Sequence, residues 1–406
     1  MNTSGSRSLP ERVAAHVRCI PRSGIRDFFD IVSTMRDVIS LGIGEPDFDT
    51  PWRVREASIW ALERGATHYT SNLGLLRLRR AICAYVESVY GVAYHPETEC
   101  LVTVGVSEAM DLAIRAMVNP GDEVLFHEPC YVSYEPLIRL AHGRPVPVRL
   151  GRESGFRLTR ERIEACLTPA ARVLILNFPN NPTGADLDPG DLAAIADLCR
   201  QRDLLVLADE IYGELRYEGP PRSIAALPEM RERTVFLHGF SKAWAMTGYR
   251  LGYACAPAPL IDAMMRIHQY TMLCAPILSQ EAAVEALREP ERDIAPMRET
   301  YRQRRNYLLH AFHQMGLPVA EPRGAFYMFP WVGDLGLTSR DFALRLLEEE
   351  RVAVVPGSAF GAAGEGHVRC SYAAATDLIR EAARRIAAFV ARLRAAAPET
   401  ARTLPS

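Results

Sequence analysis

The chain has 406 residues, of which 48% are hydrophobic and 24% charged, and its 47 basic and 49 acidic residues leave a formal charge of −2. Such a composition is that of a globular protein of two or three domains, without the basic blocks of proteins that bind nucleic acid or anionic membranes. No stretch approaches the roughly 20 apolar residues of a membrane span or resembles a signal peptide, so we expect a cytoplasmic protein with small-molecule substrates.

The first predicted helix is marked at both ends by its residues. Thr50 is expected to cap it, Pro51 to occupy its first position, and Gly65 to end it. A second helix is predicted from Ser107, with its apolar residues on one face, and a third begins at Asp188-Pro189.

Short apolar stretches of strand length alternate with these helices. This alternation is typical of an α/β domain built on a mainly parallel sheet. The predicted strands are Leu101–Val104, Glu123–Phe126, Pro145–Val148, Val173–Leu176, Leu204–Ala208, Val235–Leu237 and Leu251–Cys255.

After about residue 290 the pattern changes to long helices rich in Arg and Glu around two short strands, Ala353–Val355 and Val368–Ser371. A last amphipathic helix begins at Asp377. The sequence therefore predicts an N-terminal arm and start of the small domain at 1–50, a large domain at 51–290, a smaller α+β domain at 291–395, and a disordered tail at 396–406.

Two residue types are distributed unusually. Lys242 is the only lysine of the chain. Arginine can take the place of lysine in most ion pairs but cannot serve as an amine nucleophile. Lys242 is therefore a candidate catalytic residue. The nine cysteines are odd in number, scattered and never spaced as C-x-x-C, which disfavours a disulfide framework or a zinc site. We expect no metal.

Polar residues follow three of the predicted strands directly. The segments after Leu176, Ala208 and Leu237 read NFPNNPTG, DEIY and HGFSKAWAMTGYRLG. Because ligands of open α/β sheets bind at the carboxyl ends of the strands, a site is expected where these segments meet. They would bring together Asn181, Asp209, Tyr212, Ser241, Lys242 and Arg250.

Together these segments resemble the class I/II aminotransferases, the fold type I enzymes that use pyridoxal 5'-phosphate. The resemblance extends from SLGIGEPDFDTP (40–51) and HYTSN (68–72) to RVAVVPGSAFG (351–361) and GHVRCSYA (366–373), and its wording is closest to the prokaryotic aromatic and broad-specificity branch. Each motif alone is weak, but their order and spacing together are specific. The resemblance implies a PLP-dependent aminotransferase that acts on an L-amino acid and a 2-oxo acid such as 2-oxoglutarate.

The resemblance also implies roles at the cofactor. Lys242 matches the lysine that carries it as a Schiff base and moves the substrate's proton, and Asp209 matches the carboxylate that pairs with the pyridine nitrogen. Asn181 and Tyr212 match donors to the phenolic oxygen, and Tyr131 the aromatic residue that stacks on the ring. The phosphate is expected at the turn that contains Val106, Ser107 and Glu108, with Ser241 and Arg250.

Substrate binding follows by the same resemblance. Arg369 matches the arginine that clamps the substrate α-carboxylate, near Asn181 and Gly44, while Ile43 and Tyr327 are candidates for the side-chain pocket. Tyr69 matches a tyrosine that reaches the phosphate of the neighbouring subunit, which implies a homodimer with shared sites. Aspartate-specific relatives of the thermophilic type carry a lysine for the distal carboxylate where this chain has Ser107, so an aromatic or other apolar donor is favoured.

Other functions remain compatible with these motifs. A carbon–sulfur β-lyase or a cyclopropane-forming synthase shares the fold and most of these residues. A non-catalytic cofactor-binding domain, as in certain transcription regulators, is a more remote alternative, because only about forty residues precede the GIGEPDF motif and the lysine is present.

Overall fold

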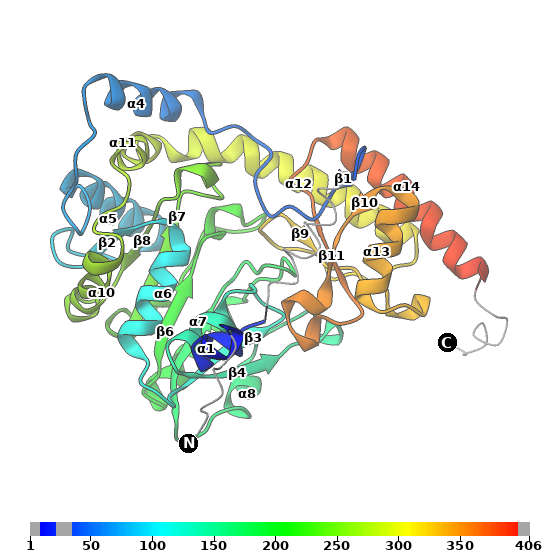
Figure 1. Ribbon diagram of the computed structural model, residues 1–406, viewed down its shortest axis with the longest axis horizontal. Helices are drawn as coiled ribbons and strands as arrows, with labels where there is room; N and C mark the ends of the chain where they lie inside the picture. The colour runs from blue at the N-terminus through cyan, green and yellow to red at the C-terminus, as the bar shows by residue number, and fades with distance from the viewer. Residues whose placement is uncertain (1–8, 22–34, 397–406) are drawn as a thin grey trace, which may run out of the picture.

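A computed structural model describes residues 9–21 and 35–396, and its centre is a seven-stranded sheet (Figure 1). The strand order is β2-β8-β7-β6-β5-β3-β4, and only β8 runs antiparallel to its neighbours. The strands are β2 (Cys100–Thr103), β3 (Glu123–Glu128), β4 (Arg144–Arg149), β5 (Ala171–Leu176), β6 (Leu205–Asp209), β7 (Thr234–Gly239) and β8 (Gly252–Cys255). Each overlaps a predicted strand, and the mainly parallel α/β architecture is confirmed.

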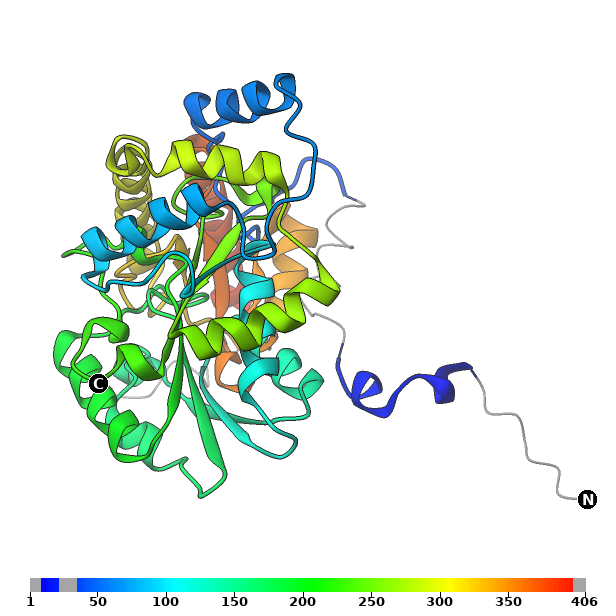
Figure 2. The ribbon, with the colours of Figure 1, turned by 90° about the vertical axis from the view of Figure 1, so that its left-hand side faces the viewer.

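Helices cover both faces of this sheet (Figure 2). One face packs against α6 (Gly105–Met117), α7 (Tyr134–Leu140) and α10 (Ala258–Thr271), and the other against α5 (Leu76–Tyr90), α8 (Arg160–Glu164), α9 (Pro189–Gln201) and α11 (Ile277–Ala286). Successive strand residues therefore enter different cores. Leu125 packs with the α8 and α9 side, while Val124 and Phe126 pack with the α6 side.

Two predicted helix starts are corrected by local hydrogen bonds. Helix α6 begins at Gly105 rather than Ser107, because the Glu108 carboxylate accepts the Val104 N–H at 2.5 Å and so satisfies a donor ahead of the first turn. Thr50 does not cap α4 (Trp52–Glu63): its hydroxyl donates to the Ala245 carbonyl at 2.6 Å, and Pro51 is the N-cap.

The C-terminal part forms its own core from α12 (Pro290–Gln314), α13 (Ser339–Glu350) and α14 (Thr376–Ala396) around short strands. Strand β1 (Ile39–Ser40) pairs with β10 (Val352–Ala353), while β11 (Val355–Pro356), β12 (Val368–Ser371) and β9 (Tyr327–Met328) form a second small sheet. The predicted strand Ala353–Val355 is thus two strands in different sheets. The domain boundaries at 50, 290 and 395 stay a prediction, and the tail from 397 lies outside the described residues.

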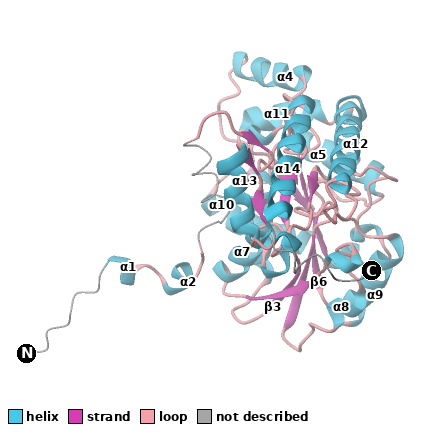
Figure 3. Cartoon of the chain, turned by 90° about the vertical axis from the view of Figure 1, so that its right-hand side faces the viewer, coloured by secondary structure: helices cyan, strands magenta, loops and turns pink. Residues whose placement is uncertain are grey.

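Near the N-terminus, α1 (Leu9–Arg12) and α2 (Ala15–Arg18) project from the body of the molecule (Figure 3). They contain no buried residue. Among the helices of the described chain, none is long and apolar enough to cross a membrane.

Candidate active site

A cavity of about 370 Å³ opens at the carboxyl ends of β5, β6 and β7, where the sequence predicted that polar segments meet. Its size is within the range of small-molecule sites. The predicted residues that line it are Gly44, Val106, Ser107, Tyr131, Asn181, Asp209, Tyr212, Ser241, Lys242, Arg250, Tyr327 and Arg369. Residues from both the central sheet and the C-terminal part therefore form one cavity.

Lys242 follows β7 and extends into this cavity. Its Nζ donates a hydrogen bond to the Gly44 carbonyl at 2.6 Å. Burial, reinforced by the nearby Arg369 and Arg250 guanidinium groups, lowers the pKa of Lys242 to about 8. Roughly a tenth of the amine is then neutral at pH 7, far more than for an ordinary lysine.

Asp209 ends β6 and is buried. The Tyr134 hydroxyl donates to one of its carboxylate oxygens at 2.7 Å, and the Ile211 N–H donates to the other at 3.3 Å. Desolvation raises the pKa of Asp209, opposed by these two hydrogen bonds. No ion pair joins Asp209 to a basic residue in the described ranges, so this carboxylate is a buried acceptor that lacks a cation.

Another part of the cavity is suited to an anion. Ser107 lies in the first turn of α6, whose N-terminal amides and dipole favour negative charge, and Ser241 and Arg250 line the same cavity. Two glycines permit this close packing. A Cβ on Gly105 would lie 2.8 Å from an Arg250 nitrogen, and a Cβ on Gly252 would lie 2.6 Å from the Gly105 and Val106 backbone.

Arg369, on β12, enters the cavity from the C-terminal part and is buried. Its Nη1 donates to Asn181 Oδ1 at 2.9 Å and its Nη2 to the Gly42 carbonyl at 2.6 Å, while its Nε has no partner among the described residues. The guanidinium lies over the Tyr327 ring, 4.5 Å from the ring centroid. An unpartnered buried N–H of arginine is suited to a carboxylate ligand.

Three aromatic side chains shape the middle of the cavity. The Tyr212 and Tyr327 hydroxyls are 2.8 Å apart, so one donates to the other. A Cβ on Gly44 would lie 2.7 Å from the Tyr327 hydroxyl, which explains the glycine at this position. The Tyr131 ring lies against the Tyr134 ring with an interplanar angle of 82°.

Three predicted site residues do not line the cavity. The Glu108 carboxylate binds the Val104 N–H and His268 instead. Ile43 is 46% exposed and Tyr69 is 84% exposed, and the roles expected for both residues stay predictions.

Sequence reasoning missed two residues that hold Asp209. Tyr134 bonds its carboxylate, and the Asn177 side-chain amide donates to its carbonyl at 3.0 Å. Asn177 directly follows β5, so the rule that located the polar segments could have found it. Tyr134 begins α7, and nothing in its local pattern distinguishes it from a core aromatic.

Comparison with known proteins agrees with this arrangement. The family described as aminotransferase class I and II matches residues 36–386. The chain belongs to this family. The Bacillus subtilis protein YugH, named as an aminotransferase, is 50% identical over 375 residues, which cover 92% of this chain and 97% of YugH. The aromatic-amino-acid aminotransferase 2 of Thermococcus litoralis is 44% identical, with coverage of 89% and 93%.

A solved structure is similar as well. The aspartate aminotransferase from Thermus thermophilus with maleate has a TM-score of 0.89 and 37% identity, and the comparison covers 94% of this chain and all of that one. This chain is therefore a pyridoxal-phosphate-dependent aminotransferase, which transfers an amino group between an amino acid and an oxo acid. The cavity fits that cofactor, because it offers both residues suited to bind an anion and a buried carboxylate without a cation.

Proposed function

We propose that Lys242 carries the cofactor and moves the substrate's proton. The observation that supports this most is that the only lysine of the chain extends into the cavity, with a pKa of about 8. Pyridoxal phosphate supplies an electron sink for the charge left on the substrate α-carbon. Lys242, when neutral, can accept the proton from that carbon and return it elsewhere.

The residues around Lys242 would hold and orient the cofactor. Ser107, Ser241 and Arg250 would bind the phosphate with the N-terminus of α6, as would the Val106 and Glu108 backbone. Asp209 would pair with the protonated ring nitrogen, and Tyr131 would stack on the ring. This pairing would relieve the desolvation that raises the pKa of Asp209.

Asn181 would serve two ligands at once. Because its Oδ1 accepts from Arg369, its Nδ2 is free to donate to the phenolic oxygen of the cofactor, beside Tyr212. Arg369 would bind the substrate α-carboxylate through its fork of N–H groups, close to Gly44. Arg369 Nη2 now donates to the Gly42 carbonyl, and burial lowers the pKa of Arg369. If the substrate carboxylate replaced this carbonyl as the acceptor, the hydrogen bond would be stronger because the new acceptor is charged.

An aromatic or other apolar L-amino acid is the proposed amino donor. The basic residues of the described chain that line the cavity are Lys242, Arg250 and Arg369, and each already has a proposed partner. Among the described residues, no further cation is left there for a side-chain carboxylate. Met110, Leu137 and Tyr327 offer apolar surface instead, in keeping with the relative named for aromatic amino acids. The proposed acceptor, 2-oxoglutarate, is best compared with pyruvate, which lacks a second carboxylate.

The proposed assembly is a homodimer in the cytoplasm, with Tyr69 reaching the partner's phosphate site. Large exposed apolar side chains support this, because Trp52 and Trp60 on α4, Tyr69 in the segment after α4, and Tyr270 on α10 are each more than half exposed. Mixed dimers test it. Lys242→Ala and Tyr69→Ala subunits, each weakly active alone at limiting cofactor, are mixed in equal amounts. If sites are shared, each mixed dimer has one intact site, so about a quarter of all sites should regain wild-type activity. No recovery in confirmed mixed dimers would contradict sharing.

The function itself is tested by spectroscopy of purified protein with pyridoxal phosphate. Borohydride should attach the cofactor to the peptide that contains Lys242, and Lys242→Ala should abolish attachment. Particular amino acids should convert the unreduced chromophore to the pyridoxamine form and release their keto acids. Pyruvate and ammonia released without an acceptor would instead indicate a lyase.

A further inference from the structure

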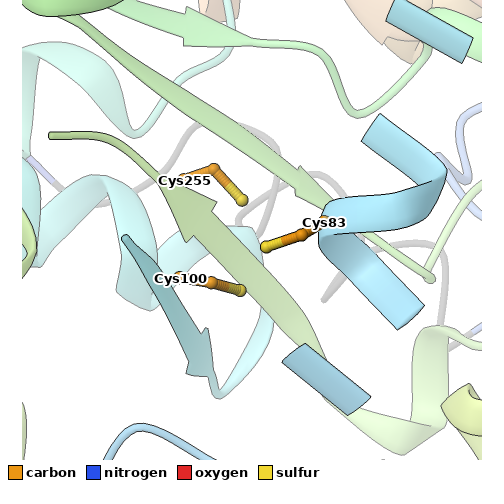
Figure 4. A group of neighbouring side chains, drawn as sticks. All are labelled: Cys83, Cys100 and Cys255. Atoms are coloured by element: carbon orange, nitrogen blue, oxygen red, sulfur yellow. The ribbon is translucent and has the colours of Figure 1, made fainter. Parts of the chain in front are cut away.

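Three cysteines far apart in the sequence converge in the core of the central sheet. They are Cys83 in α5, Cys100 at the start of β2 and Cys255 at the end of β8, and their side chains point toward one another (Figure 4). All three sulfur atoms lie within 4.8 Å of one another, and all three residues are buried. In the described part of the chain, this is the one group of three metal-ligating side chains at such distances.

Strand pairing explains the convergence. Cys100 and Cys255 are direct partners across the antiparallel β2–β8 pair. The Ala256 N–H donates to the Glu99 carbonyl, so the 99–256 pair is hydrogen-bonded and the 100–255 pair is of the closer, non-hydrogen-bonded kind, with Cα atoms about 4.5 Å apart. Helix α5 packs over β2 and brings in Cys83 from a third element.

The surroundings hold polar groups that lack partners. The buried Tyr94 and Tyr253 hydroxyls have no hydrogen-bond partner among the described residues, and both phenols lie within electrostatic range of Cys83 and Cys255. Tyr253 is two residues before Cys255 on β8, so both side chains lie on one face of the sheet. These two hydroxyls are therefore available as donors to a charged group placed among the thiols.

A buried cation faces the same cluster. Arg79 precedes Cys83 by one turn of α5, is 6% exposed, and donates to the Gly74 and Pro96 carbonyls. Within the described residues it forms no ion pair with a carboxylate, and burial lowers its pKa, opposed most by Cys100 and Cys83 and then by Glu97. Three thiolates and one divalent cation would carry a charge of −1, which the guanidinium balances.

We propose that Cys83, Cys100 and Cys255 form a three-thiolate site for a soft divalent cation of the zinc type. Zinc–sulfur bonds of about 2.3 Å place three sulfurs around one ion roughly 4 Å apart, so the cluster would contract by less than about 1 Å. Each thiol that binds loses its proton to solvent. The Tyr94 and Tyr253 hydroxyls would then be available as donors to the charged cluster.

The ion would fasten α5 to the edge of the sheet rather than take part in transamination. Cys100 and Cys255 stand at one end of the β2–β8 pair, and Thr103 and Gly252 stand at the other end, next to the anion-binding turn. The two ends of the pair are three residues apart along each strand, which is about 10 Å. Loading should therefore raise the melting temperature and leave kcat unchanged.

The experiment compares holoenzyme produced in medium supplemented with zinc or with cadmium and purified without chelators. We expect one ion per chain by mass spectrometry, a sulfur-to-cadmium charge-transfer band, and an X-ray absorption spectrum dominated by sulfur ligands. At free cation a hundredfold above Kd, Tm should rise by about 3 °C. The transamination rate should not differ between loaded and chelator-treated enzyme.

Matched variants locate the ion. Cys83→Ser and Cys255→Ala should lose the ion and its Tm increase, whereas Cys199→Ala, which removes a buried thiol outside the cluster, should keep both. Wild-type enzyme without a stoichiometric ion, or with nitrogen and oxygen ligands only, would overturn the proposal even if the variants fail to fold. A Cys100–Cys255 disulfide in metal-free protein would overturn it too.

Discussion

The hydrogen bond from Tyr134 to Asp209 gives the sharpest test of how the site works. Tyr134→Phe removes one oxygen and keeps the ring in place. The lost bond is 2.7 Å long, buried, and made to the carboxylate that is proposed to pair, when ionised, with the cofactor ring nitrogen. A hydrogen bond to a charged group contributes about 1.5–3 kcal/mol, which corresponds to roughly a 10- to 150-fold change in an equilibrium constant.

The sign of the effect follows from the pKa of Asp209. Burial already raises it, and the Tyr134 donor lowers it. Without the donor the pKa rises further, so the ionised fraction at a given pH falls. Cofactor affinity should therefore weaken most on the acid side and approach the wild-type value at alkaline pH.

Fluorescence titration of the apoenzyme with pyridoxal phosphate between about pH 5 and 9 measures this change. Tyr131→Phe is the matched control, because it removes a hydroxyl from the same cavity that bonds no described residue. A Tyr134→Phe affinity equal to wild type at every pH, or equal to that of Tyr131→Phe, would refute the reasoning.

Three further predictions concern the clamp, the lysine and the fold. Arg369→Lys keeps the positive charge but loses the paired N–H donors of the guanidinium, so kcat/KM for the amino donor should fall about 10- to 150-fold while cofactor affinity stays unchanged. Unaltered kcat/KM in steady-state kinetics would show that Arg369 does not bind the substrate. If Lys242 carries the cofactor as proposed, incorporation needs its neutral amine, so the stopped-flow rate of incorporation should rise with pH up to about 8 and level off above. A rise that continues to pH 10 would contradict the lowered pKa of Lys242. Asp186→Ala leaves the buried Arg216 guanidinium without its 2.7 Å partner and should lower the free energy of unfolding, measured with denaturant, by about 3–5 kcal/mol. The control Asp203→Ala, which breaks an exposed ion pair, should lower it by less than about 1 kcal/mol. Equal losses in the two variants would refute the conclusion that the buried Asp186–Arg216 pair stabilises the fold.

Much of the active site could be predicted from the sequence because its residues follow strands. A stretch such as Val173–Leu176 is recognisable by its apolar, β-branched residues, and in a parallel sheet all such strands end at one edge. Asn181, Asp209 and Lys242 could therefore be expected at one cavity from the sequence alone. A single lysine in the chain strengthened the prediction for Lys242.

Only the tertiary structure determined which side chains touch. Local periodicity reports whether a residue is buried, but not the element it faces. Nothing in the sequence near Tyr134 could therefore show that the packing of α7 places its hydroxyl on Asp209. The Glu108 carboxylate likewise bonds its own helix start and His268, so only the Glu108 backbone remains for the phosphate site that the sequence predicted.

The three cysteines show the same limit most clearly. Their spacing in the chain disfavoured a metal site, because the sequence rules for such sites concern ligands that are neighbours along the chain. Cys100 and Cys255 meet only because β8 inserts antiparallel beside β2, and Cys83 joins them because α5 covers that edge. Strand order and register are set by the packing of the whole sheet, so contacts between distant residues were decided by the tertiary structure, whereas the strands, the helices and the polar segments that follow the strands were determined by the sequence alone.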